Sequence, residues 1–166
     1  MAVGSFDDAS PFHRVLRRVA GTKAGRVVFR PTAHRLDLLV NKISGGRYSF
    51  AGIAAGLPTV ILTTTGAKSG KPRTVALLGI PHPDGVAVVA TNYGGSRHPG
   101  WYYNLRAYPQ ARITIAGDTW DATARLATPE ERESIWAWGV NMYPALRKEE
   151  VWAGERRIEA FVLERH

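Results

Sequence analysis

The central and C-terminal parts of the chain alternate short apolar runs with turns rich in glycine, proline and aspartate. Most of the runs are dominated by β-branched and other apolar residues, and in residues 119–126 apolar and polar positions alternate. Runs of this kind, bounded by turn residues, are typical of antiparallel β-strands. They cover residues 60–65, 73–80, 86–91, 111–116, 119–126 and 157–164. About six short antiparallel strands with few helices predict a mainly β fold that closes into a barrel.

Helical patterns surround and interrupt this β region. Thr128-Pro129-Glu130-Glu131 has the form of a capping box with proline at the first helical position, and it predicts a helix that ends at Tyr143-Pro144. A short aromatic helix is predicted after Pro99. Residues 10–19 and 31–43 place apolar side chains on one helical face, which predicts two further helices. Residues 145–156 are predicted to form a charged loop.

Composition predicts one domain over residues 1–166, with a basic helical segment over residues 1–50. The 166 residues are 45% hydrophobic, which is enough for a sizeable core. The chain has no cysteine, and its five histidines have no metal-ligand spacing, so we expect neither disulfides nor a metal site. No apolar run approaches the roughly 20 residues that span a bilayer, and no signal-peptide pattern is present, so we expect a cytoplasmic protein.

The positive charge is concentrated near the N-terminus. Residues 9–50 contain nine Lys or Arg and one acid, Asp37, so this segment accounts for the whole net charge of +8. Such a segment is expected to seek anionic surfaces such as membrane headgroups, nucleic acid or an acidic coenzyme. Its helices could instead cover the barrel, which is the commoner fate of amphipathic helices. An anionic membrane surface therefore remains a candidate partner, and the protein could lie peripherally on the inner face of the membrane.

The loop 66–71, Gly-Ala-Lys-Ser-Gly-Lys, superficially resembles a phosphate-binding P-loop. It has three residues instead of four between its glycines, it has Pro72 where Ser or Thr should follow the lysine, and a strand pattern follows it. A nucleoside-triphosphatase site is therefore excluded. Lys68, Lys71 and Arg73 still bring three cations close to backbone N–H groups of the loop, which favours an anionic ligand. The alternative is a solvated hairpin tip, since charged tips are common.

Three motifs in order resemble one known family. They are TTGAKSGKPR at 64–73, VVATNYGG at 88–95 and HPGWYYNL at 98–105, with Pro109 following. Their order and spacing are similar to those of the deazaflavin-dependent nitroreductases of actinobacteria, which use the reduced deazaflavin coenzyme F420. The resemblance covers about residues 60–126 closely and the C-terminal part more loosely. It implies a split β-barrel like those that bind FMN, an oxidoreductase activity, and F420 in preference to FMN.

The resemblance also implies the residues of the site. Lys68 and Arg73 would hold the phosphate and tail of the coenzyme, the strand end after residue 89 would lie beside the deazaflavin, and the third motif would cover its other side. The implied coenzyme-binding residues are Ala67, Lys68, Ser69, Arg73, Thr74, Val75, Leu78, Ala90, Thr91, Asn92, Tyr93, Gly100, Trp101, Tyr102, Tyr103 and Asn104. The acceptor would lie against Leu78, Trp138, Tyr143 and Leu146.

The predicted function is hydride transfer from reduced F420 to a planar conjugated acceptor, such as a quinone or a nitro compound. The coenzyme supplies this chemistry, so no Ser-His-Asp triad is expected. A proton could come from Tyr143, from Tyr48 or from solvent, although Tyr143 could equally be a buried aromatic residue with a satisfied hydroxyl. Trp136 and Trp138 are expected mainly to pack in the core and lid.

The chain departs from the family pattern where the acceptor would bind. The best-known members carry three tyrosines on successive turns near the end of the helix that here begins after Thr128. Here only Tyr143 remains, and Leu146 and Glu149 occupy the other two matched positions. Leu78 replaces a tyrosine of the second core strand, and Asn92 and Tyr93 replace a serine and a lysine. These differences favour quinones or other planar apolar acceptors over nitroimidazoles.

Two other classes of function fit the same sequence. A non-catalytic carrier could bind F420 or a related flavin without turnover. A membrane-surface or nucleic-acid binder could use residues 9–50, with the barrel as a platform, although nucleic acid is not the expected partner. His82 and His98 each precede a proline and are expected to be exposed turn residues. The sequence indicates no oligomeric state.

Overall fold

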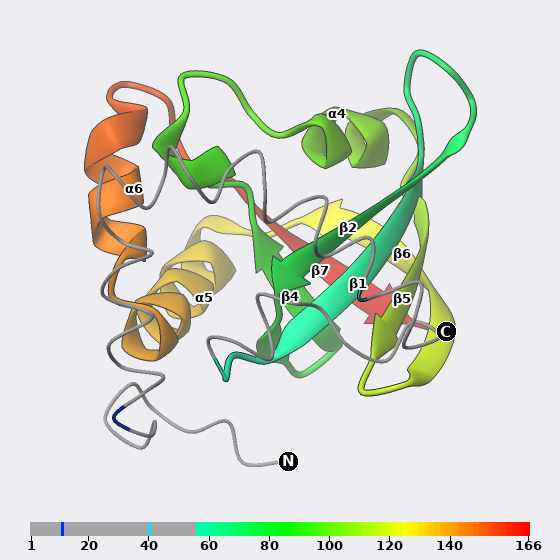
Figure 1. Ribbon diagram of the computed structural model, residues 1–166, viewed down its shortest axis with the longest axis horizontal. Helices are drawn as coiled ribbons and strands as arrows, with labels where there is room; N and C mark the ends of the chain where they lie inside the picture. Colours follow the sequence, from blue (N-terminus) through cyan, green and yellow to red (C-terminus); the bar gives the residue numbers. More distant parts are fainter. Residues whose placement is uncertain (1–10, 12–39, 41–55) are drawn as a thin grey trace.

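The computed structural model describes Pro11, Val40 and residues 56–166 of the chain. The helices expected at 10–19 and 31–43, Tyr48 and most of the basic segment 9–50 lie outside these described residues, so the prediction of one domain over residues 1–166 stays a prediction. The described part contains a seven-stranded sheet and three α-helices (Figure 1). None of its helices combines the length and the apolar character that crossing a bilayer requires.

The elements follow one another along the chain as predicted for a mainly β protein. They are β1 (Thr59–Thr65), β2 (Pro72–Leu78), β3 (Ile80–His82), β4 (Gly85–Val89), the 3₁₀ turn η1 (Asn92–Gly94), α4 (Gly100–Ala107), β5 (Gln110–Ile115), β6 (Asp118–Leu126), α5 (Pro129–Met142), α6 (Leu146–Ala153) and β7 (Ala160–Arg165). All neighbouring strands are antiparallel, in the order β2-β1-β5-β6-β7-β4-β3.

The sheet curls because its two edge strands are consecutive in the chain. β2 and β3 lie at opposite edges of the sheet, yet only Gly79 separates Leu78 from Ile80. The edges must therefore approach each other, as in a split barrel. A Cβ atom at Gly79 would lie 2.5 Å from Val60 Cγ2, so any side chain where the chain passes from β2 to β3 would force the buried Val60 to shift. The single strand expected over 73–80 is thus two strands, and the sheet has seven strands where about six were expected.

Two other sequence-based boundaries were wrong. Residues 145–156, expected to be a loop, contain the helix α6, in which Leu146, Glu149 and Ala153 are buried. The β5–β6 turn is formed by Ala116 and Gly117, both with positive φ, instead of Gly117 and Asp118. The capping box at Thr128 is confirmed, because its side chain accepts from Glu131 N while the Glu131 carboxylate accepts from Thr128 N.

β7 is buried on both faces, which explains why its sequence is almost continuously apolar. Phe161 and Leu163 belong to the cluster inside the curled sheet, whereas Ala160 and Val162 belong to a second cluster under α5. α5 covers the outer face of β4 and β7 through Ile135 and Met142, and α6 lies beside α5 (Figure 1). The first cluster thus fills the inside of the curled sheet, and the second packs α5 against its outer face.

Candidate functional site

Three segments that carry the predicted site lie at one end of the sheet. Antiparallel pairing along the path β1-β5-β6-β7-β4 makes β1 and β4 parallel, so their C-terminal ends point the same way. The loop 66–71 follows β1, and the turn 90–98 follows β4. α4 lies next to both of them and contacts β1 (Figure 1). The fold thus brings the three sequence motifs together.

The loop 66–71 is closed by its own backbone and exposes its cations. Gly66 N donates to Lys71 O at 2.9 Å, Gly70 N donates to Gly66 O at 2.8 Å, and Gly70 has a φ of 63°. Lys68, Lys71 and Arg73 are exposed, and none of them makes an ion pair within the described part of the chain. Three exposed cations beside a tight turn form a surface suited to an anionic group.

Asn104 connects α4 to this loop. Its Oδ1 accepts a hydrogen bond of 2.9 Å from Ala67 N, and its Nδ2 donates one of 2.9 Å to Thr64 Oγ1. Both ends of the amide are therefore satisfied by protein atoms. Asn104, which was predicted to bind the coenzyme, fixes the position of the loop relative to the helix.

The turn 90–98 has an unusual backbone. Asn92, Tyr93 and Gly94 have φ values of 49°, 54° and 67°, so two residues other than glycine adopt the left-handed region. The turn is closed by Gly94 N donating to Thr91 O at 3.0 Å and Gly95 N donating to Asn92 O at 2.9 Å. A Cβ atom at Gly94 would lie 2.7 Å from Glu149 O, so the turn is packed directly against α6.

Arg156, which the sequence analysis did not single out, donates hydrogen bonds to three backbone carbonyl groups of this turn. Its Nε donates to Gly95 O at 2.8 Å, its Nη1 to Ala90 O at 2.9 Å and its Nη2 to Thr91 O at 2.6 Å. Burial lowers the pKa of the guanidinium from its ordinary value, but the group remains a cation at neutral pH. An arginine among the charges of 145–157 gives no sequence signal for this role.

His98 is part of the same structure, and the expectation of an exposed turn residue was wrong. Its ring stacks on Tyr102 with centroids 3.9 Å apart, and its Nδ1 lies 3.3 Å from Arg156 Nη1. Arg156 can only donate, so Nδ1 is the acceptor and the proton of the neutral ring lies on Nε2. Burial, and next the charge of Arg156, lower the pKa of His98, whereas Glu159 raises it.

The predicted coenzyme-binding residues differ in how accessible they are. Ala90 and Trp101 are 0% and 7% exposed and belong to the core, where Trp101 packs edge-to-face on Phe161. The exposed members are Lys68, Ser69, Arg73, Tyr93, Gly100 and Tyr103, and the partly buried ones are Ala67, Thr74, Val75, Leu78, Thr91, Asn92, Tyr102 and Asn104. Of the strand end, the side chains of Thr91, Asn92 and Tyr93 are therefore the ones that a ligand can reach.

The predicted acceptor residues lie around the C-terminal end of α5. Tyr143 is mostly buried, and burial, Glu149 and Tyr93 raise the pKa of its hydroxyl above the ordinary value of 10.0. α6, which begins three residues after Tyr143, packs against the turn 90–98. Leu146 is 3% exposed, and Leu78 packs on the cluster that contains Met142. Leu78 pairs with Thr59 and Arg73 pairs with Thr64, so Leu78 lies toward the far end of β2 from the cations.

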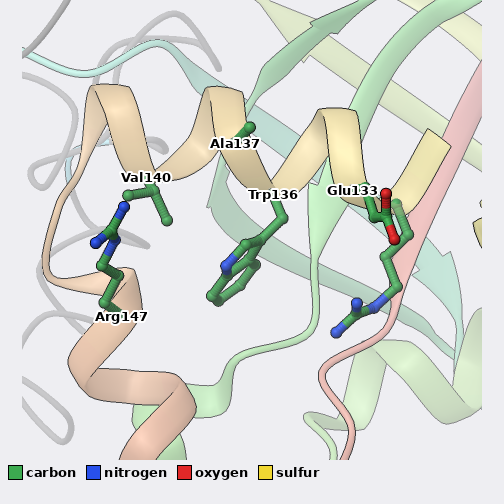
Figure 2. A pocket seen from close by; sticks show the side chains of 6 residues that line it. Glu133, Trp136, Ala137, Val140 and Arg147 are labelled. Carbon is green, nitrogen blue, oxygen red and sulfur yellow. The ribbon is translucent and has the colours of Figure 1, made fainter. Parts of the chain in front are cut away.

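The two tryptophans of α5 have separate environments. Trp138 is 50% exposed, so the expectation that it packs in the core was wrong. Trp136 is partly buried and points into a hollow of about 370 Å³ beside α6 (Figure 2). Figure 2 shows Val140 and Arg147 at one side of the hollow and Glu133 at the other. A planar molecule could contact Trp136 here.

His82 belongs to a charged cluster away from these loops. Its side chain is 10% exposed and lies 3.7 Å from both Asp84 and Glu131, so the expectation of an exposed turn residue was wrong here too. The three side chains have metal-ligand spacing, but Arg125 donates to Asp84 at 3.0 Å and to Glu131 at 2.6 Å. A fixed guanidinium thus already supplies the positive charge that a cation would bring.

Comparison with known proteins identifies the family. A family model described as F420H(2)-dependent quinone reductase matches residues 39–165. An F420H(2)-dependent quinone reductase of Mycobacterium tuberculosis is 35% identical over 83 residues, which are 50% of this chain and 56% of that protein. The match thus spans little more than half the length of that relative.

Further similarities agree with this match. A second Mycobacterium tuberculosis protein, also named for F420H(2)-dependent quinone reduction, is 34% identical over 113 residues, which are 68% of this chain and 94% of that protein. The solved structure of the F420-H2 dependent reductase FDR-A has 38% identity and a TM-score of 0.59, covering 64% of this chain and 94% of that one. The split-barrel fold expected from the three motifs is confirmed, and the chain belongs to the F420H(2)-dependent quinone reductase family.

Proposed function

We propose that the protein binds reduced F420 and transfers a hydride from it to a planar conjugated acceptor of the quinone type. One observation carries the proposal: exposed cations on the loop 66–71 and the small, accessible turn at Thr91 and Asn92 lie at the same end of the sheet. A ligand that is anionic at one end and flat at the other fits this arrangement. The family to which the chain belongs supports the same choice of coenzyme.

The residues of the site have separate tasks in this proposal. Lys68 and Arg73 bind the anionic tail, and Thr91 and Asn92 flank the flat ring. The bound coenzyme supplies the hydride, so the protein provides position and excludes water. An acceptor must then lie within about 3 to 3.5 Å of the hydride-bearing carbon, since transfer requires near-attack geometry. The space between Tyr93 and Tyr143 is the region in which we place it.

Tyr143 serves the acceptor as a hydrogen-bond donor and not as the acid that completes its reduction. Burial and Glu149 raise the pKa of its hydroxyl, so the phenol keeps its proton throughout the physiological range. A neutral phenol can orient an acceptor oxygen, but a group with so high a pKa gives up its proton reluctantly. Solvent, or Tyr48, which lies outside the described residues, is therefore the source of the proton that accompanies the hydride to a quinone.

Titration of the protein with F420 tests the proposal, with fluorescence as the readout and FMN as the control. Binding of F420 in preference to FMN is expected, followed by oxidation of reduced F420 when a quinone is added. Binding without oxidation by quinones or nitro compounds would instead identify a carrier, and no binding of F420 would refute the proposal. Nitro compounds are the second acceptor class to assay. We expect them to be poorer acceptors, because Leu146 and Glu149 stand at the positions matched to two tyrosines of the nitroreductases.

The basic segment 9–50 suggests contact with an anionic membrane surface as an additional property. Its nine Lys or Arg against one acid can bind acidic headgroups at roughly 1 kcal/mol per residue near the surface. Sedimentation with vesicles of phosphatidylserine, compared with neutral vesicles, measures this property. Removal of residues 1–20 should reduce sedimentation and leave F420 affinity unaltered, and equal sedimentation of both forms would contradict the proposal.

One relative of known structure bears on assembly. A solved structure described as a domain-swapped dimer has 38% identity and a TM-score of 0.59, covering 64% of this chain and 80% of that one. We propose that self-association be examined for this protein too, by light scattering at several concentrations. A mass that stays at that of a single chain would exclude a stable dimer.

A further inference from the structure

Arg156 directs each of its three nitrogen atoms at a different acceptor in the turn 90–98. The accepting groups are the carbonyl oxygens of Ala90, Thr91 and Gly95, at 2.6 to 2.9 Å, and Nδ1 of His98 lies 3.3 Å from the same guanidinium. These atoms come from both sides of the turn. The guanidinium therefore works as a clamp that joins the end of β4 to the start of the segment leading into α4.

The turn requires such a clamp because its backbone is strained. Asn92 and Tyr93 both adopt the left-handed region, which residues other than glycine rarely occupy. Strained backbone persists only where the surrounding structure over-determines it, and such strain is common at ligand sites. Asn92 Nδ2 adds one bond to Arg97 O at 2.9 Å, but the larger number of contacts comes from Arg156.

Only a planar, forked cation can make this set of contacts. The donors of Arg156 leave from Nε, Nη1 and Nη2 in fixed directions. A lysine at this position would bring the same charge at a single nitrogen, so it could reach some of the carbonyls but not all three together. The shape of the group, and not only its charge, is therefore needed.

We propose that Arg156 is a positioning residue for the coenzyme: it fixes the turn 90–98 so that Thr91 and Asn92 present a preformed surface to the flat ring. This inference rests on the proposed function, because it assigns the ring to that turn. Arg156 itself makes no contact with the ring, since its nitrogens are directed at protein acceptors. Its effect is transmitted through the backbone of Thr91, whose carbonyl it holds at 2.6 Å.

Two variants and a matched control separate this role from a general loss of stability. The variants are Arg156→Ala, which removes the clamp, and Arg156→Lys, which keeps the charge. The control is Arg157→Ala, because Arg157 is the exposed neighbour and its guanidinium lies 3.7 Å from the Glu159 carboxylate instead of against the turn. Hydrogen exchange of the peptide containing Gly94 and Gly95 reports the order of the turn without any coenzyme. Fluorescence titration reports F420 affinity.

We expect faster exchange in the turn and F420 affinity lower by tenfold or more for Arg156→Ala, with a smaller change for Arg156→Lys. The KM for reduced F420 should rise while the KM for the quinone stays unchanged. A residue needed only for stability would instead lower the amount of active protein, and thus the apparent kcat, without changing either KM. The control should resemble the unmodified protein in every measurement.

Three results would overturn the inference. Unchanged exchange in Arg156→Ala would show that the turn does not depend on the clamp. Faster exchange with unchanged F420 affinity would show that the turn does not receive the coenzyme, so the ring would have to lie elsewhere, although binding of F420 by the protein would still stand. Failure of the unmodified protein to bind F420 would refute the proposed function and this inference together.

Discussion

Asn104 donates a hydrogen bond from Nδ2 to Thr64 Oγ1 over 2.9 Å, and so joins the aromatic helix α4 to the strand β1. Its Oδ1 accepts from Ala67 N over the same distance, at the start of the loop that carries the cations. Thr64 is 2% exposed, so water has little access to the hydroxyl group. One amide therefore sets the position of the cation loop relative to the helix.

Asn104→Ala should lower the free energy of unfolding by about 2 to 3 kcal/mol, because Thr64 and Ala67 N each lose a partner in a partly buried place. Denaturant unfolding with an unchanged m-value measures this loss. Asn141→Ala on the exposed face of α5 is the control and should change stability by less than about 0.5 kcal/mol. Equal effects of the two substitutions would show that the bridge contributes little.

Arg73 and Lys71 differ in their expected contributions to coenzyme binding, although both are exposed. Arg73→Ala should weaken F420 binding by about tenfold or more, because a charge-assisted contact is typically worth about 1.5 to 3 kcal/mol. Lys71→Ala should have a smaller effect, because a lysine ammonium cannot hold an anion with two parallel hydrogen bonds as a guanidinium can. Neither should change the melting temperature appreciably. Unaltered F420 affinity in the Arg73 variant would show that the anionic tail of the coenzyme does not bind at this loop.

The positions of most strands and of the three motifs along the chain could be predicted, because both depend on local patterns. Short apolar runs and turn residues located β1, β4, β5 and β6, and the capping box at Thr128 located α5. The division of residues 73–80 into two strands could not be predicted in the same way. It depends on Gly79 passing close to Val60, which is a contact between segments distant in the chain.

The parts of the site that the sequence did not reveal depend on contacts across the fold. Arg156 finds its acceptors about 60 residues earlier in the chain, so nothing near it in the sequence indicates a clamp. His98 looked like an exposed residue of a turn because its neighbours are Arg97 and Pro99. Its burial comes from Tyr102, one helical turn later, together with Arg156.

Trp138 and Tyr143 provide a test of where the acceptor lies. Trp138 is 50% exposed, so Trp138→Ala should lower the free energy of unfolding by less than the roughly 3 to 5 kcal/mol that loss of a fully buried tryptophan costs. If the acceptor contacts this end of α5, Tyr143→Phe should change turnover and acceptor preference with little effect on F420 affinity. Quinone reduction rates for several quinones, measured beside F420 affinity, decide the question. Loss of F420 affinity in parallel with turnover would refute this placement of the acceptor.

Glu131 should stabilise the fold down to unusually acidic pH. Hydrogen bonds from Arg125 and from Thr128 lower the pKa of its carboxyl from 4.5 to about 2. A folded-state pKa below the unfolded value contributes stability that is present above pH 4.5 and is lost as the pH falls toward 2. Glu131→Gln should thus lower the melting temperature by several degrees at pH 7, with the difference from the unmodified protein shrinking at pH 3. The exposed Glu130→Gln should show no such dependence.

His98 should also affect stability, but in a less acidic range. Here the folded state favours the neutral form of the group, whereas for Glu131 it favours the charged form. Burial and Arg156 lower the pKa of the folded imidazole below 6.5, so the folded protein binds fewer protons here than the unfolded chain does. Stability linked to His98 is therefore complete above about pH 6.5 and is lost as the pH falls below that value. The rings of Tyr102 and Tyr103 also face the imidazole, and the charge of Glu159 opposes the shift of the His98 pKa only partly.

Substitution by asparagine isolates this effect, because its Oδ1 can accept from Arg156 as the Nδ1 of His98 does while carrying no titratable proton. We expect His98→Asn to lose less melting temperature than the unmodified protein between pH 7.5 and 5.5, whereas the exposed His166→Asn should behave like the unmodified protein. NMR titration of the imidazole gives the pKa directly, and Arg156→Lys should leave it depressed because the charge is kept. An imidazole that titrates at or above its ordinary value would mean that burial and Arg156 do not hold His98 in its neutral form.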